Sequence, residues 1–289
     1  MRGEDTSLGS LRVIEPGALT TVQDLGRPGW AHLGVPRAGA LDRPAAALAN
    51  RLVGNPESAA VLETTMTGFS FSVERAVLLA VTGAGCELRV GDRAAPTAEP
   101  VSAPAGATVR IGPARVGVRS YLAVAGGIAV SPVLGSRSTD TLAWIGPPAV
   151  RRGDLLPLGP GGGAQVVGVD APGSQRPADR VLRLYPGPRA DWVTDLSALH
   201  GRRLRVGEAS NRVGVRLEGA PLPRAQQREL ASEGIVLGAV QLPPSGDPVV
   251  FLNDHPTTGG YPVIAVVHPD DLPVCAQVRP GEELTLRLL

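Results

Sequence analysis

The sequence contains no lysine, and all 28 of its basic residues are arginine. A Walker P-loop requires a Lys after its second Gly, so that phosphate-binding motif is excluded. The same absence excludes a Schiff-base lysine, a catalytic lysine and a biotin-carrying lysine on this chain. Arginine replaces most surface lysines adequately, so a GC-rich genome is sufficient to explain the bias.

Cysteine, net charge and long apolar runs are also scarce. Cys86 and Cys275 are the only cysteines and show no metal-ligand spacing, which is typical of a reducing compartment. A formal net charge of +1 favours neither nucleic acid nor an anionic membrane as a partner. The longest apolar runs, at 76–81 and 263–267, are too short to span a membrane, and the first residues lack the apolar stretch of a signal peptide. We therefore expect a cytoplasmic protein.

Glycine and proline, by contrast, are abundant at 37 and 28 residues, and they separate short apolar or alternating runs. This pattern predicts a mostly β fold of the sandwich or barrel type with a few short helices. The predicted strands are 11–14, 69–73, 76–82, 86–90, 109–111, 116–125, 181–184, 204–206, 235–242, 249–252, 263–267 and 284–288. Helices are predicted over 42–54, where Asp42 and Pro44 suit a helix start, over 191–199 and over 269–277.

A length of 289 residues is enough for two domains. Residues 159–178 are rich in Gly, Pro and other small residues, as linkers between domains usually are. We therefore predict a disordered N-terminus at 1–10, a first domain at 11–165, a linker at 166–178 and a second domain at 179–289. No residue-level repeat relates the two halves.

Two Gly-rich segments place arginines next to flexible backbone. In 23–42, Arg27 and Arg37 could bind a carboxylate or phosphate through bidentate hydrogen bonds, or they could be solvated arginines between two turns. In 210–219, alternation would place Arg212 and Arg216 on one face of a half-buried strand. That face would suit an anionic ligand, or it would simply be solvated.

A third Gly-rich segment, 253–262, contains the neighbours Asp254 and His255. His titrates near neutrality and could perform general acid/base work, but an exposed loop His is the more usual interpretation. Cys86, at the start of a predicted strand, is interpreted as a small core residue rather than a nucleophile. No G-x-S-x-G or H-E-x-x-H motif occurs, and the four histidines have no metal-ligand spacing.

Several long stretches occur in the order in which the KipA-like family has them. They are EPGALTTVQDLGRPGWAHLGVPRAGALD, ALANRLVGN, YLAVAGGI, LGSRSTDT and SEGIVLGAVQLPPSGDPVVFLNDHPTTGGYPVIAVV. The chain thus resembles this family from about Leu11 to Leu289. The family comprises the C subunit of 5-oxoprolinase, proteins labelled allophanate hydrolase subunit 2, and half of the carboxyltransferase domain of urea carboxylase. The resemblance implies two cyclophilin-like β-barrel domains.

The resemblance also implies site residues. It assigns catalytic roles to Asp254, Tyr261 and Gln241. It assigns substrate or nucleotide binding to Gln23, Asp24, Arg27, Asn50, Glu63, Arg212, Arg216, Thr258, Gly259 and Gly260, and no metal site. This chain departs from the family where relatives commonly have Arg-Gln and it has His255-Pro256.

By the same resemblance, the chain acts as the C subunit of an ATP-dependent 5-oxoprolinase that opens 5-oxoproline to glutamate. Its expected partners are a KipI-like subunit and a LamB/YcsF-like subunit, with ATP and Mg bound by the complex and no activity of the chain alone. Two alternatives stay open. One is a regulatory antagonist of a KipI-type kinase inhibitor, and the other is a subunit of the urea carboxylase or allophanate hydrolase type.

Overall fold

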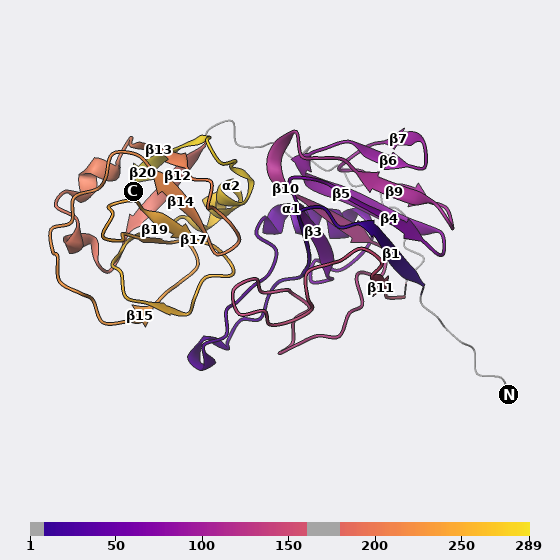
Figure 1. Ribbon diagram of the computed structural model, residues 1–289, viewed down its shortest axis with the longest axis horizontal. Coiled ribbons are helices and arrows are strands. Elements are labelled where there is room, and N and C mark those ends of the chain that lie inside the picture. The colour runs from indigo at the N-terminus through magenta and orange to yellow at the C-terminus, as the bar shows by residue number, and fades with distance from the viewer. Residues whose placement is uncertain (1–8, 161–179) are drawn as a thin grey trace. The chain divides into compact units, whose positions relative to one another are not determined.

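The structure is a computed structural model that describes residues 9–160 and 180–289. Contacts divide these residues into two compact units (Figure 1), the first made of 9–25, 43–139 and 146–160 and the second of 26–42, 140–145 and 180–289. Two short segments from the N-terminal half of the sequence therefore belong to the C-terminal unit. The predicted linker at 166–178 and most of the predicted N-terminal segment at 1–10 lie outside the described residues.

The strands of the first unit form two antiparallel sheets. The first sheet has the order β11 (Leu155–Pro157), β1 (Ser10–Glu15), β4 (Phe69–Val73), β9 (Thr108–Ile111), β6 (Leu88–Val90) and β7 (Arg93–Ala95). The second has the order β2 (Leu19–Gln23), β3 (Val61–Thr65), β10 (Val116–Val124), β5 (Val77–Gly85) and β8 (Val101–Ala103). In β4, Phe69, Phe71 and Val73 are buried while the two serines between them are partly exposed, as alternation in a half-buried strand requires.

Helix α1 (Arg43–Leu52) packs against β5 and β10 of the first unit. Its buried residues include Ala45, Leu48, Ala49 and Leu52, one face of a helix at the predicted spacing. The predicted helix at 42–54 is confirmed. The sheets contribute the side chains of an apolar core that includes Leu62, Phe71 and Leu122.

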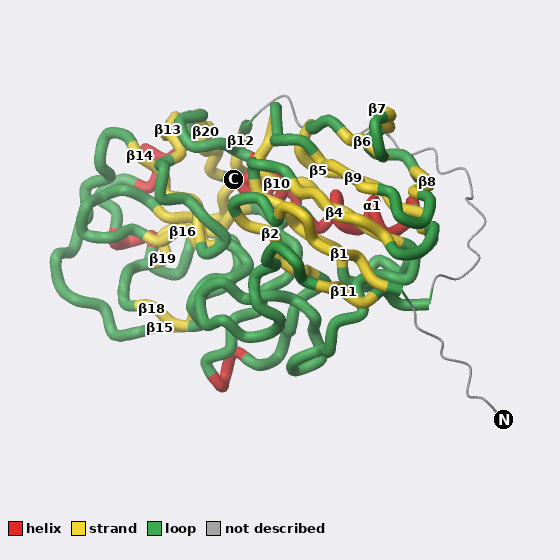
Figure 2. The backbone as a smooth tube through the Cα atoms, turned by 45° about the vertical axis from the view of Figure 1, so that its right-hand side comes forward, coloured by secondary structure: helices red, strands yellow, loops and turns green. Residues whose placement is uncertain are grey.

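The second unit contains a closed barrel. Its strands follow the order β12 (Val181–Pro186), β19 (Val263–Val267), β16 (Ala239–Gln241), β17 (Val249–Phe251), β14 (Gly214–Glu218), β13 (Arg203–Val206) and β20 (Glu283–Leu288). The barrel closes through a parallel pairing of β12 with β20. A separate ribbon pairs β15 (Glu233–Gly234) with β18 (Thr258–Gly259) (Figure 2). The barrel core includes Leu41, from the inserted segment 26–42.

The helices of the second unit are short: η1 (Ala31–Leu33), η2 (Ala190–Trp192), η3 (Leu196–Leu199), η4 (Pro269–Asp271) and α2 (Leu272–Gln277). The single helix predicted over 191–199 is wrong. Val193 and Asp195 have extended backbone between η2 and η3, and the Asp195 carboxylate accepts a hydrogen bond from the Ser197 amide to start a new turn. The strand predicted over 235–242 is also too long, because Gly238 forms a turn with a φ of 81°.

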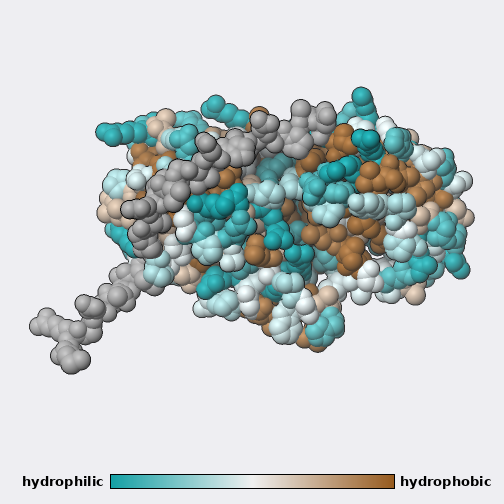
Figure 3. All heavy atoms as spheres, turned by 180° about the vertical axis from the view of Figure 1, so that it is seen from behind, coloured by the Kyte–Doolittle hydropathy of each residue, from teal (hydrophilic) through white to brown (hydrophobic). Residues whose placement is uncertain are grey.

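Hydrophobic and hydrophilic residues are mixed on the face of the molecule seen in Figure 3. Single exposed apolar side chains, among them Leu33, Trp144 and Val236, are normal for a folded chain. In the part of the chain that the structure describes, no helix is long and apolar enough to cross a membrane. The prediction of a mostly β fold with few short helices is confirmed.

Candidate functional site

Buried polar side chains gather in each unit, and the first gathering begins at the end of β2. Gln23 is fully buried, and its Nε2 donates to Thr21 Oγ1 at 2.9 Å and to the Thr139 carbonyl oxygen at 3.0 Å. Because a carbonyl can only accept, these contacts fix which end of the Gln23 amide is nitrogen. Within residues 9–160 and 180–289, Gln23 Oε1 and Thr139 Oγ1 have no hydrogen-bond partner. A buried carbonyl oxygen in this position can accept a hydrogen bond from a ligand N–H.

Asp24 follows Gln23 and orders the loop 136–138. Its Oδ1 accepts hydrogen bonds from Ser136 Oγ at 2.6 Å and Ser138 Oγ at 2.7 Å, and its Oδ2 accepts one from the Arg137 amide at 2.6 Å. Its own amide donates to Ser138 Oγ at 2.9 Å. Asp24 therefore closes a loop whose next residue, Thr139, contacts Gln23.

Glu63 lies in a row of polar residues that crosses the second sheet. Thr21, Glu63, Tyr121 and Thr82 are successive cross-strand partners on β2, β3, β10 and β5. The Tyr121 hydroxyl donates to Glu63 Oε2 at 2.8 Å, and Arg119 Nε lies 3.5 Å from Glu63 Oε1. All these side chains are buried, so the row is a polar layer inside the first unit.

Asn50, on α1, supports the turn that follows the helix. Its Nδ2 donates to the Ala59 carbonyl oxygen at 2.8 Å, and its Oδ1 accepts from Asn55 Nδ2 at 3.1 Å. Its side chain is thus engaged in local structure, and its predicted ligand contact stays a prediction.

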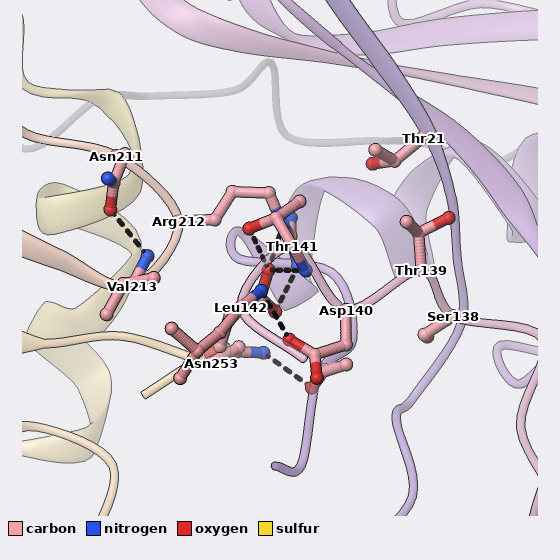
Figure 4. Close-up of polar contacts among 12 residues, drawn as sticks. Thr21, Ser138, Thr139, Asp140, Thr141, Leu142, Asn211, Arg212, Val213 and Asn253 are labelled. Carbon is pink, nitrogen blue, oxygen red and sulfur yellow. Dashed lines mark hydrogen bonds and ion pairs between the residues drawn. The ribbon is translucent and has the colours of Figure 1, made fainter. Parts of the chain in front are cut away.

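The centre of the second gathering is a fully buried ion pair between Arg212 and Asp254. Arg212 Nε donates to Asp254 Oδ2 at 2.9 Å and its Nη2 to Asp254 Oδ1 at 3.0 Å, the two-pronged geometry that suits guanidinium and carboxylate. The same Nη2 donates to the Gly39 carbonyl oxygen at 2.8 Å. Thr141 adds its amide at 2.9 Å and its hydroxyl at 2.7 Å to Asp254 Oδ2 (Figure 4). These four hydrogen bonds fix the orientation of the Asp254 carboxylate, and its predicted catalytic role stays a prediction.

Asn253, next to Asp254, attaches the inserted segment 26–42, and Asp140 orders the inserted segment 140–145 from within. Asn253 Nδ2 lies 3.1 to 3.3 Å from the carbonyl oxygens of Ala38, Gly39 and Ala40. Asp140 accepts hydrogen bonds from the amides of Leu142 at 2.9 Å and Ala143 at 3.2 Å.

The pKa of the Asp140 carboxyl is shifted from its ordinary value. Burial raises the pKa of its carboxyl, while the positive charge of Arg27 opposes that rise. Arg27 is itself buried, and its backbone amide donates to the Arg37 carbonyl oxygen at 2.7 Å. The segment that carries Arg27 is thus near Asp140 within the second unit.

The prediction that Arg212 and Arg216 lie on the same face of one strand is wrong. Strand β14 begins only at Gly214, so Arg212 belongs to the preceding turn and its side chain is buried. Arg216 lies on the strand and is exposed. An alternating pattern gives the right face only for residues inside the strand.

The remaining predicted residues lie around β16 and β18. Gln241 is buried, and its Nε2 donates to the Tyr261 carbonyl oxygen at 2.9 Å. Thr258 and Gly259 form β18, and the Tyr261 side chain is 46% exposed. This segment therefore offers backbone and a phenol at the surface.

His255 is buried rather than solvated, which contradicts the expectation of an ordinary loop histidine. Burial lowers the pKa of its imidazole, and the nearby charge of Arg37 adds to that effect. Cys86 is half-buried and Ser120 Oγ lies 3.7 Å from its sulfur, while burial raises the pKa of its thiol. No group of three or more His, Cys, Asp or Glu side chains in the described ranges could hold a metal ion.

The chain is similar to known proteins in sequence and in structure. A family model described as "Carboxyltransferase domain, subdomain A and B" matches residues 33–288. The chain is 40% identical over 280 residues to the C subunit of 5-oxoprolinase from Escherichia coli (strain K12), covering 95% of this chain and 89% of the relative. It is 31% identical over 277 residues to the protein of the same name from Haemophilus influenzae, covering 94% and 89%. The solved structure of the K. lactis urea amidolyase aligns with a TM-score of 0.89 at 28% identity, over 98% of this chain and 19% of that one.

Proposed function

This chain belongs to the carboxyltransferase domain family, subdomains A and B, and we propose that it acts as the C subunit of an ATP-dependent 5-oxoprolinase. The observation that carries the proposal is the identity of 40% to a protein of that name over nearly the full length of both chains. The activity is the hydrolysis of 5-oxoproline, a cyclic amide, to glutamate.

The proposal includes two further subunits and ATP. The chain works with a KipI-like and a LamB/YcsF-like subunit and is inactive alone. ATP binds to the complex with Mg²⁺, and the absence of lysine means that no P-loop on this chain holds its phosphates.

The site residues divide between recognition and orientation. Gln23 Oε1 accepts a hydrogen bond from the lactam N–H of the substrate, because it is a buried acceptor that needs a donor. Within the second unit, Arg27 supplies positive charge for an anionic ligand group, and Thr258, Gly259 and Gly260 present backbone N–H groups to an oxyanion.

The ion pair between Arg212 and Asp254 and its neighbours orient the other groups of the site. Asp254 holds Arg212 and Thr141 in place. Gln241 fixes the backbone at Tyr261, whose exposed ring closes over the ligand. Asp24, Asn50 and Glu63 maintain the loops and the polar row beside Gln23, while Arg216 contacts the nucleotide phosphates.

The test is glutamate release from 5-oxoproline and ATP by this chain copurified with its two partner subunits, with each subunit omitted in turn. We expect glutamate only in the full mixture. A stable three-subunit complex that releases no glutamate would refute the proposal. A Gln23→Leu variant should then raise KM for 5-oxoproline.

The similarity to urea amidolyase supports a second candidate, transfer of a carboxyl group to urea. A biotin-bearing partner would be needed, because this chain has no lysine that could be biotinylated. Urea-dependent consumption of carboxybiotin on such a partner, without glutamate release from 5-oxoproline, would favour this candidate.

A further inference from the structure

Residues 223–235 of the second unit form a connection with little regular structure, here called the strap. It follows β14 and ends in β15, which Figure 2 shows beside β18. Most strap residues are exposed, and Ile235, at the end of the strap, packs in a small apolar cluster with Ala239, Phe251 and Val263. An apolar core therefore does not fix the exposed part of the strap. Specific contacts must do so instead.

One turn of the chain supplies the contacts at the beginning of the strap. Two arginines of the strap lie over the ring of Trp192, which is buried in η2: Arg224 Cζ is 5.5 Å and Arg228 Cζ 5.3 Å from the ring centroid. The Ala225 amide donates to the Trp192 carbonyl oxygen at 2.8 Å. Gln226 Nε2 donates to Asp191 Oδ2 at 3.2 Å.

The same turn also holds the end of the strap. Arg189, which precedes η2, donates from Nε to Glu233 Oε2 at 3.0 Å and from Nη2 to Glu233 Oε1. These hydrogen bonds lower the pKa of the Glu233 carboxyl and raise that of the Arg189 guanidinium. Residues 189–192 therefore contact the strap at both ends.

The end of the strap determines where the predicted ligand segment lies. Glu233 pairs with Gly259, and Gly234 with Thr258. The Ile235 amide donates to the Thr257 carbonyl oxygen at 2.9 Å. The backbone of 257–259 is thus attached to the strap by hydrogen bonds.

The strap lies close to the two glycines of that segment, where a side chain would have little room. A Cβ on Gly259 would lie 2.7 Å from Ile235 Cδ1 and 3.0 Å from Gln241 Nε2, and a Cβ on Gly260 would lie 3.3 Å from the Leu230 carbonyl oxygen. Gly259 and Gly260 therefore allow the strap and Gln241 to approach closely. Their lack of side chains serves packing as well as any ligand.

We propose that Glu233 is a positioning residue: its ion pair with Arg189 holds β15 against β18 and thereby sets the backbone of Thr258–Gly260 for ligand binding. The proposal rests on the proposed function for its assumption that this segment binds the substrate. The ion pair acts through the backbone of β18, with no contact to substrate required.

The first experiment measures amide hydrogen exchange of the full chain with Glu233→Gln. We expect exchange of the amides in 257–261 to rise about fivefold, because the ribbon loses its charged attachment. Glu218→Gln is the matched control, since it removes an exposed carboxylate that pairs with Arg205 elsewhere on the barrel. Arg189→Gln should reproduce the effect of Glu233→Gln. Unchanged exchange at 257–261 in both variants would overturn the proposal, whatever the activity.

The second experiment measures kinetics in the complete complex. Glu233→Gln should raise KM for 5-oxoproline about fivefold with kcat nearly unchanged, and Glu233→Asp should restore part of the loss. Faster exchange together with wild-type KM would refute a role in ligand binding. A wild-type complex that releases no glutamate, with faster exchange in the variant, would refute the proposed function and leave the positioning of β18 established.

Discussion

Asp24 in the first unit and Asp254 in the second hold segments that are close in sequence, residues 136–138 and Thr141, with different sets of donors. Asp24 is half-buried and orders its loop through two serine hydroxyls and a backbone amide. Asp254 is fully buried and accepts a two-pronged contact from Arg212 in addition to the two donors of Thr141. A carboxylate removed from water needs a positive charge beside it, and Arg212 supplies that charge to Asp254.

The largest expected effect is that of breaking the buried pair. Asp254→Ala leaves the Arg212 guanidinium buried without its carboxylate, so the free energy of unfolding should fall by about 3–5 kcal/mol. Urea denaturation of the full chain measures it, with Asp254→Asn as a control that keeps the shape and removes the charge. A loss below about 1 kcal/mol would show that the barrel does not depend on this pair.

Removing the other carboxylate should cost less. Asp24→Ala leaves the hydroxyls of Ser136 and Ser138 and one backbone amide without their acceptor, but water can reach part of this loop. We expect a loss of about 1–3 kcal/mol in the same denaturation experiment. A cost equal to that of Asp254→Ala would mean that partial exposure gives Asp24 no advantage.

Removing a single hydroxyl beside each carboxylate compares Asp24 and Asp254 at a smaller scale. Ser138→Ala removes a hydroxyl that both donates to Asp24 and accepts from the Asp24 amide. Thr141→Val removes one donor to Asp254 while the Thr141 amide and Arg212 remain. We expect about 1–2 kcal/mol for Ser138→Ala and about 0.5–1 kcal/mol for Thr141→Val, measured by chemical denaturation. The reverse order would indicate that the charged pair needs the Thr141 hydroxyl more than the loop needs Ser138.

Apolar patterns predicted much of the fold from the sequence. The bounds of β4 and β19 agree with the predicted strands, and α1 occupies the predicted helix. Strands β2 and β3 were not predicted, because Thr21, Gln23 and Glu63 are buried there and break the apolar pattern. Their partners, Thr139 and Tyr121, lie far away in the sequence, so no local pattern shows that these polar groups can be buried.

The site residues were predicted unevenly, some from Gly-rich segments and the rest from the resemblance. Arg212 and Asp254 were both named, but their mutual ion pair was not, since it joins residues that only the fold brings together. Thr141 and Asn253 were missed as parts of the site. The available signal was the run from Ser136 to Thr141, in which four hydroxyl side chains, one arginine and one aspartate follow one another without an apolar residue.

The smallest expected effect concerns His255, beside Asp254. Burial depresses the pKa of its imidazole in the folded chain below the ordinary 6.5, so the unfolded chain binds a proton more readily. Its contribution to stability is therefore present above pH 6.5 and is lost as the pH falls through the folded value. Asp140 has the opposite sign, because its raised pKa favours the folded chain at low pH. Only the difference between wild type and His255→Asn isolates the histidine. Thermal unfolding from about pH 7.5 to 5 should show a shallower loss of stability in the variant, and parallel curves would mean that His255 is protonated as easily in the folded chain as in water.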